Sequence, residues 1–347
     1  MIDTHDEISL LPAFRSVFLL LGLSLATAQA RQLTDMSGRT EEIPERPQRV
    51  FPAVTMMTPV MAALAPELMT GLAFRLAPGA EAFLPAGVAG LPVVPVLEDM
   101  NAEAILVMRP DLAIGWSGAG PLMRRTETLM QRLRIPALFY KGERLDEYPA
   151  TFRALGDALG RKVRGERLAR YLEDSQVRLR QALRDLPESE RPRVYYAESP
   201  DGLTTQCDST SRMEVIRLAG GVPALSCADK GFATSREVDF ETLLELDPDV
   251  VVARNPDSAA RLRGEPRWQL LRAVREGRVY GIPELPFNWF DRPPSFMRAL
   301  GAHWLARLLH PRRFDEDIRS EAVRFNQVFF GIEPPAAALD RLLEPRS

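Results

Sequence analysis

Apolar and polar residues follow one pattern that occurs twice in the chain. Residues 101–116 and 239–254 share a short amphipathic stretch, the dipeptide Pro-Asp and a continuous apolar run. Proline ends a helix and aspartate suits the following turn, so each copy predicts a helix, a turn and a strand. The runs at 112–114 and 250–252 show no alternation, which predicts strands buried on both faces, as in a parallel sheet.

A second pair of similar segments opens each half of the chain. Residues 46–51 and 191–196 both carry an Arg-Pro turn followed by an apolar run. Further strands are predicted at 71–74, 137–140 and 279–282. Strands that alternate with helices form parallel sheets covered by helices. The repeat therefore predicts two similar α/β lobes.

A purely helical pattern lies between the two halves. Apolar residues in 148–159 recur at spacings of three and four, which form one helix face. A second pattern at 166–186 predicts a helix about 31 Å long, at about 1.5 Å per residue. Such a helix, packed on both lobes, would hold them nearly fixed. Residues 294–330 predict further helices, and 334–347 a loose tail.

The first thirty residues have the pattern of an export signal. Arg15 precedes an apolar run at 17–23, and Ala28 and Ala30 place small residues before a predicted cut. The run is shorter than the about 20 apolar residues that span a bilayer. We expect a cleaved signal peptide and a mature chain that starts at Arg31; the alternative is a buried N-terminal helix.

Length and composition indicate a globular protein of two domains. The chain has 347 residues, more than one hydrophobic core usually spans, of which 46% are hydrophobic and 26% charged. A net charge of −3 gives no reason to expect nucleic acid or an anionic membrane as partner. Cys207 and Cys227 lie in no CxxC motif, so they are either a disulfide or two separate thiols.

Four short motifs stand in an order typical of one family: residues 33–50, 100–111, 268–280 and 287–293. With the repeat and the central helices, they make the chain similar to periplasmic binding proteins whose lobes are joined by one long helix. These proteins serve ABC importers for ferric siderophores, haem, vitamin B12 and some metals or oxyanions. Members often begin with a lipidated Cys, and no Cys follows the apolar run here, so the resemblance implies a free periplasmic protein.

The resemblance implies an α/β fold of two similar lobes with mainly parallel sheets, a long joining helix and a ligand cleft between the lobes. The expected divisions are a signal peptide at 1–30, an N-terminal lobe at 31–145, linking helices at 146–188, a C-terminal lobe with terminal helices at 189–333, and the tail at 334–347. We expect a monomer that captures an anionic metal chelate without transforming it.

Ligands of open α/β sheets bind beyond the carboxyl ends of the strands. The candidate ligand-binding residues are therefore Thr55, Met56, Arg75, Trp116, Ser117 and Lys141 in the first lobe, and Tyr196, Glu198, Arg254, Asn288, Trp289 and Arg292 in the second. Among these, Arg75, Lys141 and Arg254 would add positive potential and favour an anionic ligand.

The segment 287–293 carries the strongest local signal. It is similar to a cleft loop of the vitamin B12-binding members, but Asn288 stands where they have Asp, which argues against a corrinoid. Trp289 could stack on a planar chelate, and Arg292 could pair with its carboxylates or phosphates. Alternatively, Trp289 belongs to the core and Arg292 pairs with Asp291 to fix the loop.

No cofactor and no metal site is expected. His5 lies in the signal, and His303 and His310 are expected on the surface or at the ends of the tail helices, so strand ends offer no imidazole for zinc or manganese. A ferric siderophore-like iron chelate is the leading ligand; corrinoid, haem and molybdate or tungstate are the alternatives. A chelatase-like enzyme is the alternative class, but the sequence has no GxSxG, no P-loop and no GxGxxG after a strand.

The resemblance also implies that the protein docks on an ABC permease with its ATPase. In this family an exposed Glu on each lobe meets Arg pockets of the permease, and Glu81 and Glu214 hold similar positions in this chain. Otherwise, Glu81 is an ordinary loop charge and Glu214 a carboxylate that favours a helix start.

Overall fold

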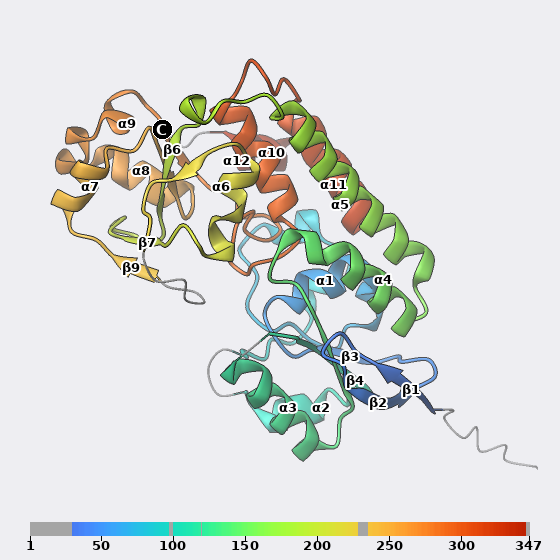
Figure 1. The fold of residues 1–347 in the computed structure, drawn as a ribbon. Coiled ribbons are helices and arrows are strands. Elements are labelled where there is room, and N and C mark those ends of the chain that lie inside the picture. The colour runs from blue at the N-terminus through green and yellow to red at the C-terminus, as the bar shows by residue number, and fades with distance from the viewer. Residues whose placement is uncertain (1–29, 97–99, 119, 228–234, 345–347) are drawn as a thin grey trace, which may run out of the picture.

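The computed structural model describes residues 30–96, 100–118, 120–227 and 235–344. In Figure 1 this chain forms two lobes, each with its own sheet, and a group of helices along one side joins them. The predicted α/β fold with two lobes, parallel sheets and a long joining helix is confirmed. Within the described ranges, no helix has the length and apolarity needed to cross a bilayer. The predicted export signal lies outside these ranges, except for Ala30.

The first lobe is built on a parallel sheet of three buried strands in the order β3-β4-β5. The strands are β3 (Val50–Pro52), β4 (Leu112–Trp116) and β5 (Ala137–Tyr140). Its helices are α1 (Met57–Leu64), α2 (Ala102–Val107) and α3 (Pro121–Leu133). A hairpin of β1 (Ala30–Thr34) and β2 (Thr40–Pro44) is tied to β5, because the backbone N–H of Met36 donates to the carbonyl of Phe139 at 3.1 Å.

The second lobe is built on a parallel sheet in the order β11-β10-β6-β8. The strands are β6 (Arg193–Ala197), β8 (Val222–Pro223), β10 (Val250–Ala253) and β11 (Val279–Gly281). A separate antiparallel ribbon consists of β7 (Thr204–Gln206) and β9 (Ser235–Glu237). The helices are α6 (Glu214–Leu218), α7 (Phe240–Leu246), α8 (Pro256–Gly264) and α9 (Arg272–Arg275).

The Arg-Pro segment and the Pro-Asp segment, which both recur in the sequence, contact each other once in each lobe. In the first lobe, the carboxylate of Asp111, from the Pro-Asp turn, accepts a hydrogen bond from the backbone N–H of Arg49 at 3.0 Å. In the second lobe, Asp249 accepts in the same way from the backbone N–H of Arg193 at 2.8 Å. Each Asp therefore fixes the start of the first strand beside the central strand, which explains why the Arg-Pro and Pro-Asp segments recur together.

The joining group consists of α4 (Tyr148–Ala158), α5 (Lys162–Ala182), α10 (Arg298–Leu309), α11 (Ile318–Phe330) and α12 (Ala336–Leu343). The helix predicted at 166–186 is α5, which begins and ends four residues earlier than predicted. Gly156 of α4 and Gly165 of α5 allow the two helices to touch, since a Cβ on Gly165 would lie 2.3 Å from the carbonyl oxygen of Phe152.

Stacked phenylalanines form the core of the joining group. The ring of Phe329 lies 4.5 Å from that of Phe296 and 4.4 Å from that of Phe325, centroid to centroid. Phe152 meets Phe296 edge to face at 5.3 Å. These contacts bind α4 of the linking region to α11 near the end of the chain. Helix α11 is therefore part of the core that joins the lobes.

Three local expectations are wrong. Residues 71–74 are not a strand, because only Leu72 pairs, in an isolated bridge with Val93. The segment 334–347 is not loose throughout, since 336–343 form α12, which buries Leu339 and Leu342. His303 is fully buried rather than exposed on its helix.

Arg298 joins the two lobes at their junction, and its side chain is buried. The guanidinium donates to the Glu214 carboxylate of the second lobe at 2.9 Å and to the carbonyl of Glu143, which follows β5 of the first lobe, at 2.6 Å. Glu214 in turn accepts from the backbone N–H of Leu145 at 2.9 Å. Burial raises the pKa of Glu214, which the Arg298 charge opposes.

We expect Arg298→Met to lower the free energy of unfolding by about 3 kcal/mol or more, because it leaves Glu214, which is only 14% exposed, without its counter-charge. Urea unfolding of the two proteins at pH 7 measures this difference. Arg312→Met, at an exposed arginine of the same region, should stay within about 0.5 kcal/mol of wild type. Equal stabilities of the Arg298 and Arg312 variants would contradict this role of Arg298.

Candidate ligand site

Segments that follow the strand ends of the two sheets meet at the junction of the lobes. Phe74 and Phe287 contact each other edge to face, with ring centroids 6.1 Å apart. Ser211 donates a hydrogen bond to the Glu143 carboxylate at 3.1 Å. Glu143 follows β5 and Phe287 follows β11, so a segment beyond the carboxyl end of one strand from each sheet lies at this junction. Ligands of open α/β sheets bind at such ends.

Two arginines of the second lobe converge on one carboxylate at the end of β6. Glu198 follows the last residue of this strand and is buried. Its Oε1 accepts from Nη2 of Arg292 at 2.7 Å and from Nη1 of Arg212 at 3.3 Å. We call Arg212 and Arg292 the anchored arginine pair. Glu198 thus brings together two cations that lie 80 residues apart in the sequence.

Asp291 is a second, fully buried anchor for the same pair. Its Oδ2 accepts from Nη1 of Arg212 at 3.1 Å, and its Oδ1 lies 3.9 Å from Nε of Arg292. The hydroxyl of Tyr196 donates to Oδ1 at 2.9 Å. Burial and the Asp291 charge raise the pKa of Tyr196 well above its ordinary value, so Tyr196 stays a neutral donor.

The loop that carries Asp291 and Arg292 is shaped by Asn288. The side-chain oxygen of Asn288 accepts from the backbone N–H of Phe290 at 2.9 Å and of Asp291 at 3.2 Å. Its amide donates to the carbonyl of Arg254, at the end of β10, at 3.1 Å. Asn288 is therefore a buried structural residue that sets the position of its neighbours.

The two arginines of the anchored pair are partly exposed, whereas the carboxylates that hold them are buried. The side chains of Arg212 and Arg292 are 28% and 36% exposed, whereas those of Glu198 and Asp291 are 9% and 0% exposed. Burial lowers the pKa of Arg292, but the neighbouring Tyr196, Asp291 and Glu198 raise it above its ordinary value overall. Both guanidinium groups are oriented by the two carboxylates and remain partly exposed, so they can bind an oxyanion.

The predicted site residues lie in both lobes. Tyr196, Glu198 and Arg292 lie in the cluster around the anchored arginine pair, and Arg254 is half-buried beside it. In the first lobe, Thr55 and Ser117 are half-buried, Arg75 and Lys141 are exposed, and Met56 and Trp116 are buried.

Trp289 and Glu214 do not have the surroundings that their predicted roles require. Trp289 is fully buried, and its Nε1 donates to the carbonyl of Leu285 at 2.9 Å, so it belongs to the core and does not stack on a ligand. Glu214 is paired with Arg298 inside the lobe junction, and its side chain is 14% exposed. It is therefore a structural residue and not an exposed docking contact.

The predicted ligand-binding residues include neither Arg212 nor Asp291. Arg212 lies in a short 3-10 turn, Ser211–Met213, and follows no predicted strand. Asp291 is expected to pair with Arg292 and fix the loop, or to serve as an acid in the chelatase-like alternative. Their common position is created by tertiary contacts, and the one signal in the sequence is the acid-base pair Asp291-Arg292 itself.

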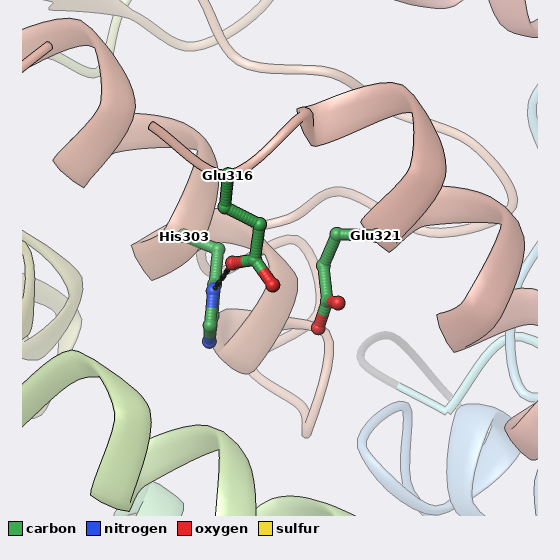
Figure 2. A group of neighbouring side chains, drawn as sticks. All are labelled: His303, Glu316 and Glu321. Atoms are coloured by element: carbon green, nitrogen blue, oxygen red, sulfur yellow. Dashed lines mark hydrogen bonds and ion pairs between the residues drawn. The ribbon is translucent and has the colours of Figure 1, made fainter. Parts of the chain in front are cut away.

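One group of side chains has the composition of a metal site. His303 of α10, Glu316, which precedes α11, and Glu321 of α11 place their ligand atoms within 4.8 Å of one another (Figure 2). Nδ1 of His303 lies 2.5 Å from Glu316, and the two interact directly in Figure 2. Arg178 of α5, however, bonds both carboxylates, at 2.6 Å in the case of Glu321. This guanidinium supplies the cation, so the group is an ion-pair network that joins three helices.

Comparison with known proteins agrees with this architecture. Residues 85–285 match the family described as "Periplasmic binding protein". The molybdate-binding protein MolA of Haemophilus influenzae is 25% identical over 254 residues, 67% of this chain and 71% of MolA. An ABC transporter solute binding protein from Sulfurospirillum deleyianum superposes with a TM-score of 0.82 at 32% identity, covering 90% of this chain and 99% of that one.

Molybdate-bound MolA has the same fold, with a TM-score of 0.70 at 20% identity and coverage of 87% of this chain and 98% of MolA. The family match spans more than half of the chain and crosses from the first lobe, through the joining helices, into the second. The protein therefore belongs to the periplasmic binding protein family.

Proposed function

We propose that this protein, as a solute-binding component of an ABC importer, captures an oxygen-rich anion on Arg212 and Arg292 and delivers it to the permease. The observation that carries this proposal is the anchoring of both arginines on the buried carboxylates of Glu198 and Asp291. Guanidinium groups bind carboxylate, phosphate and similar oxyanions through paired N–H donors. An orientation fixed before binding lowers the entropy that the ligand would otherwise have to offset.

The aromatic residues at the strand ends argue against a planar macrocycle as ligand. Trp116 is 6% exposed, and Tyr196 and Trp289 are fully buried. Stacking on haem or on a corrinoid needs an open aromatic face, which none of the three offers. Because these aromatic rings are buried, we favour a ligand that is recognised through its charged oxygen atoms.

An iron chelate with anionic oxygen ligands, of the ferric siderophore kind, is our first candidate. Its exposed oxygen atoms would accept from the anchored arginine pair, and the exposed Arg75 and Lys141 add positive charge on the first lobe. Molybdate is the second candidate, favoured by the similarity to MolA, whose name gives molybdate as its ligand. Both candidates place oxyanion groups at the same arginines.

We further propose that Glu81 contributes to permease docking. It is exposed, lies in the 3-10 helix Ala80–Phe83 after Gly79, and borders a groove of about 460 Å³ that is lined by residues of both lobes and of α12. Charges at such rims govern encounter and partner choice more than stability.

We expect calorimetric titration to show binding of a ferric siderophore or of molybdate, and weak or no binding of haemin and cyanocobalamin. Arg212→Gln and Arg292→Gln should each weaken the affinity about thirtyfold or more, because each removes a pre-oriented charged donor. Arg261→Gln, at an exposed arginine of α8, is the matched control and should bind as wild type. Wild-type affinity in both site variants, or a preference for haemin, would contradict the proposal.

Glu81→Ala should leave ligand affinity and melting temperature unchanged and lower uptake through the cognate importer severalfold, because only the contact with the permease is lost. Transport of radiolabelled ligand into cells that carry the variant measures this effect. Glu42→Ala, at an exposed carboxylate of β2, is the control. Uptake at the wild-type rate by the Glu81 variant would refute the docking role.

A further inference from the structure

Glu198 is held in place by a second set of contacts on its other oxygen. While Oε1 accepts from the anchored arginine pair, Oε2 accepts from the side-chain amide of Gln206 and from the hydroxyl of Ser235 at 3.3 Å. A carboxylate with both oxygens bonded cannot rotate without losing one set of partners. The direction in which Glu198 presents Oε1 to Arg212 and Arg292 thus depends on Gln206 and Ser235.

These two donors come from the small ribbon of β7 and β9. Gln206 is the last residue of β7 and Ser235 the first of β9, and they are directly opposite partners in the antiparallel register. Each strand has three residues. A two-stranded ribbon of this size is not stable by itself in water, so other contacts must hold it.

A disulfide ties the chain just after β7 to Cys227, next to these donors. Cys207 follows Gln206 and is bonded to Cys227, 20 residues on, with Cα atoms 5.5 Å apart. Of the two alternatives left open by the sequence, the structure contains the bonded pair. The carboxylate of Asp208 reinforces the junction, since it accepts from the backbone N–H of Cys227 at 3.2 Å and from the hydroxyl of Ser226 at 2.9 Å.

We infer that the disulfide between Cys207 and Cys227 is a positioning element of the ligand site. It fixes the end of β7, keeps Gln206 and Ser235 on Oε2 of Glu198, and thereby sets the direction of the anchored arginine pair. Gln206 is buried to 1% exposure, so its amide cannot be replaced by solvent without a local opening of the ribbon. This inference rests on the proposed function, in which the two arginines bind the anion.

The test compares, in four variants, the affinity for molybdate or for a ferric siderophore, whichever of these anions the wild-type protein binds. Cys207→Ser with Cys227→Ser should bind the anion about tenfold more weakly, as should Gln206→Leu with Ser235→Ala, because both changes release Glu198. The quadruple variant should bind about as weakly as either double variant, since both act through one carboxylate and their effects do not add. Leu339→Ala, in a buried position of α12 that makes none of these contacts, lowers stability and should keep wild-type affinity.

Wild-type affinity of the cysteine variant, or losses that multiply in the quadruple variant, would overturn the inference. A crystal structure of the cysteine variant without ligand gives a second test that does not depend on binding. We expect the Gln206 to Glu198 bond to be lost and the Glu198 to Arg292 distance to change from 2.7 Å. An unchanged cluster would also overturn the inference, whereas failure of the wild-type protein to bind any oxyanion would refute only the proposed function.

Discussion

The buried guanidinium of Arg298 determines how the two lobes meet. It is bonded to the Glu214 carboxylate of one lobe and to the carbonyl of Glu143 of the other, and Glu214 also accepts from the backbone N–H of Leu145. A buried charge pair of this kind is costly to break, because either partner left alone would remain desolvated. With this contact and the phenylalanine stack of α4 and α11 in place, segments that follow the strand ends of both sheets meet at one junction. The ligand site depends on that orientation.

The proposed site also pairs arginines with carboxylates, but here the arginines are not fully buried. At the lobe junction, the arginine is fully buried and its carboxylate partner is only 14% exposed, and their pairing serves structure. At the end of β6, only the carboxylates of Glu198 and Asp291 are buried, while Arg212 and Arg292 reach the surface. In the proposed function, these buried acids orient the partly exposed arginines into a charged, rigid anion receptor. By our inference, the ribbon of β7 and β9 and the disulfide next to it extend this support by holding the other oxygen of Glu198.

Much of the fold could be predicted from the sequence, because it is encoded in local patterns. The Pro-Asp and Arg-Pro segments recur since Asp111 and Asp249 each fix the start of a first strand, and this contact has the same local sequence in both lobes. The long helix followed from its apolar spacing. Residues 334–347 read as a loose tail because the apolar face of α12 is short, and its burial depends on the rest of the fold.

The site could be predicted only in part, because tertiary contacts decide the role of each side chain. The strand-end rule located Tyr196, Glu198 and Arg292, but the sequence could not show that Trp289 points into the core or that Glu214 meets Arg298. Arg212 follows no strand and reaches the site through its contacts with two anchors from distant segments. Charge and position along the chain therefore indicated the region, and burial separated the proposed binding residues from structural ones.

The most direct test of the account is a crystal structure of the protein purified with the ligand that it carries from the periplasm. The account predicts that an anionic oxygen of this ligand lies within hydrogen-bond distance of both Arg212 and Arg292, while Glu198 and Asp291 keep their contacts with the two arginines. A ligand bound elsewhere, with the two arginines bonded only to their carboxylate anchors, would contradict it.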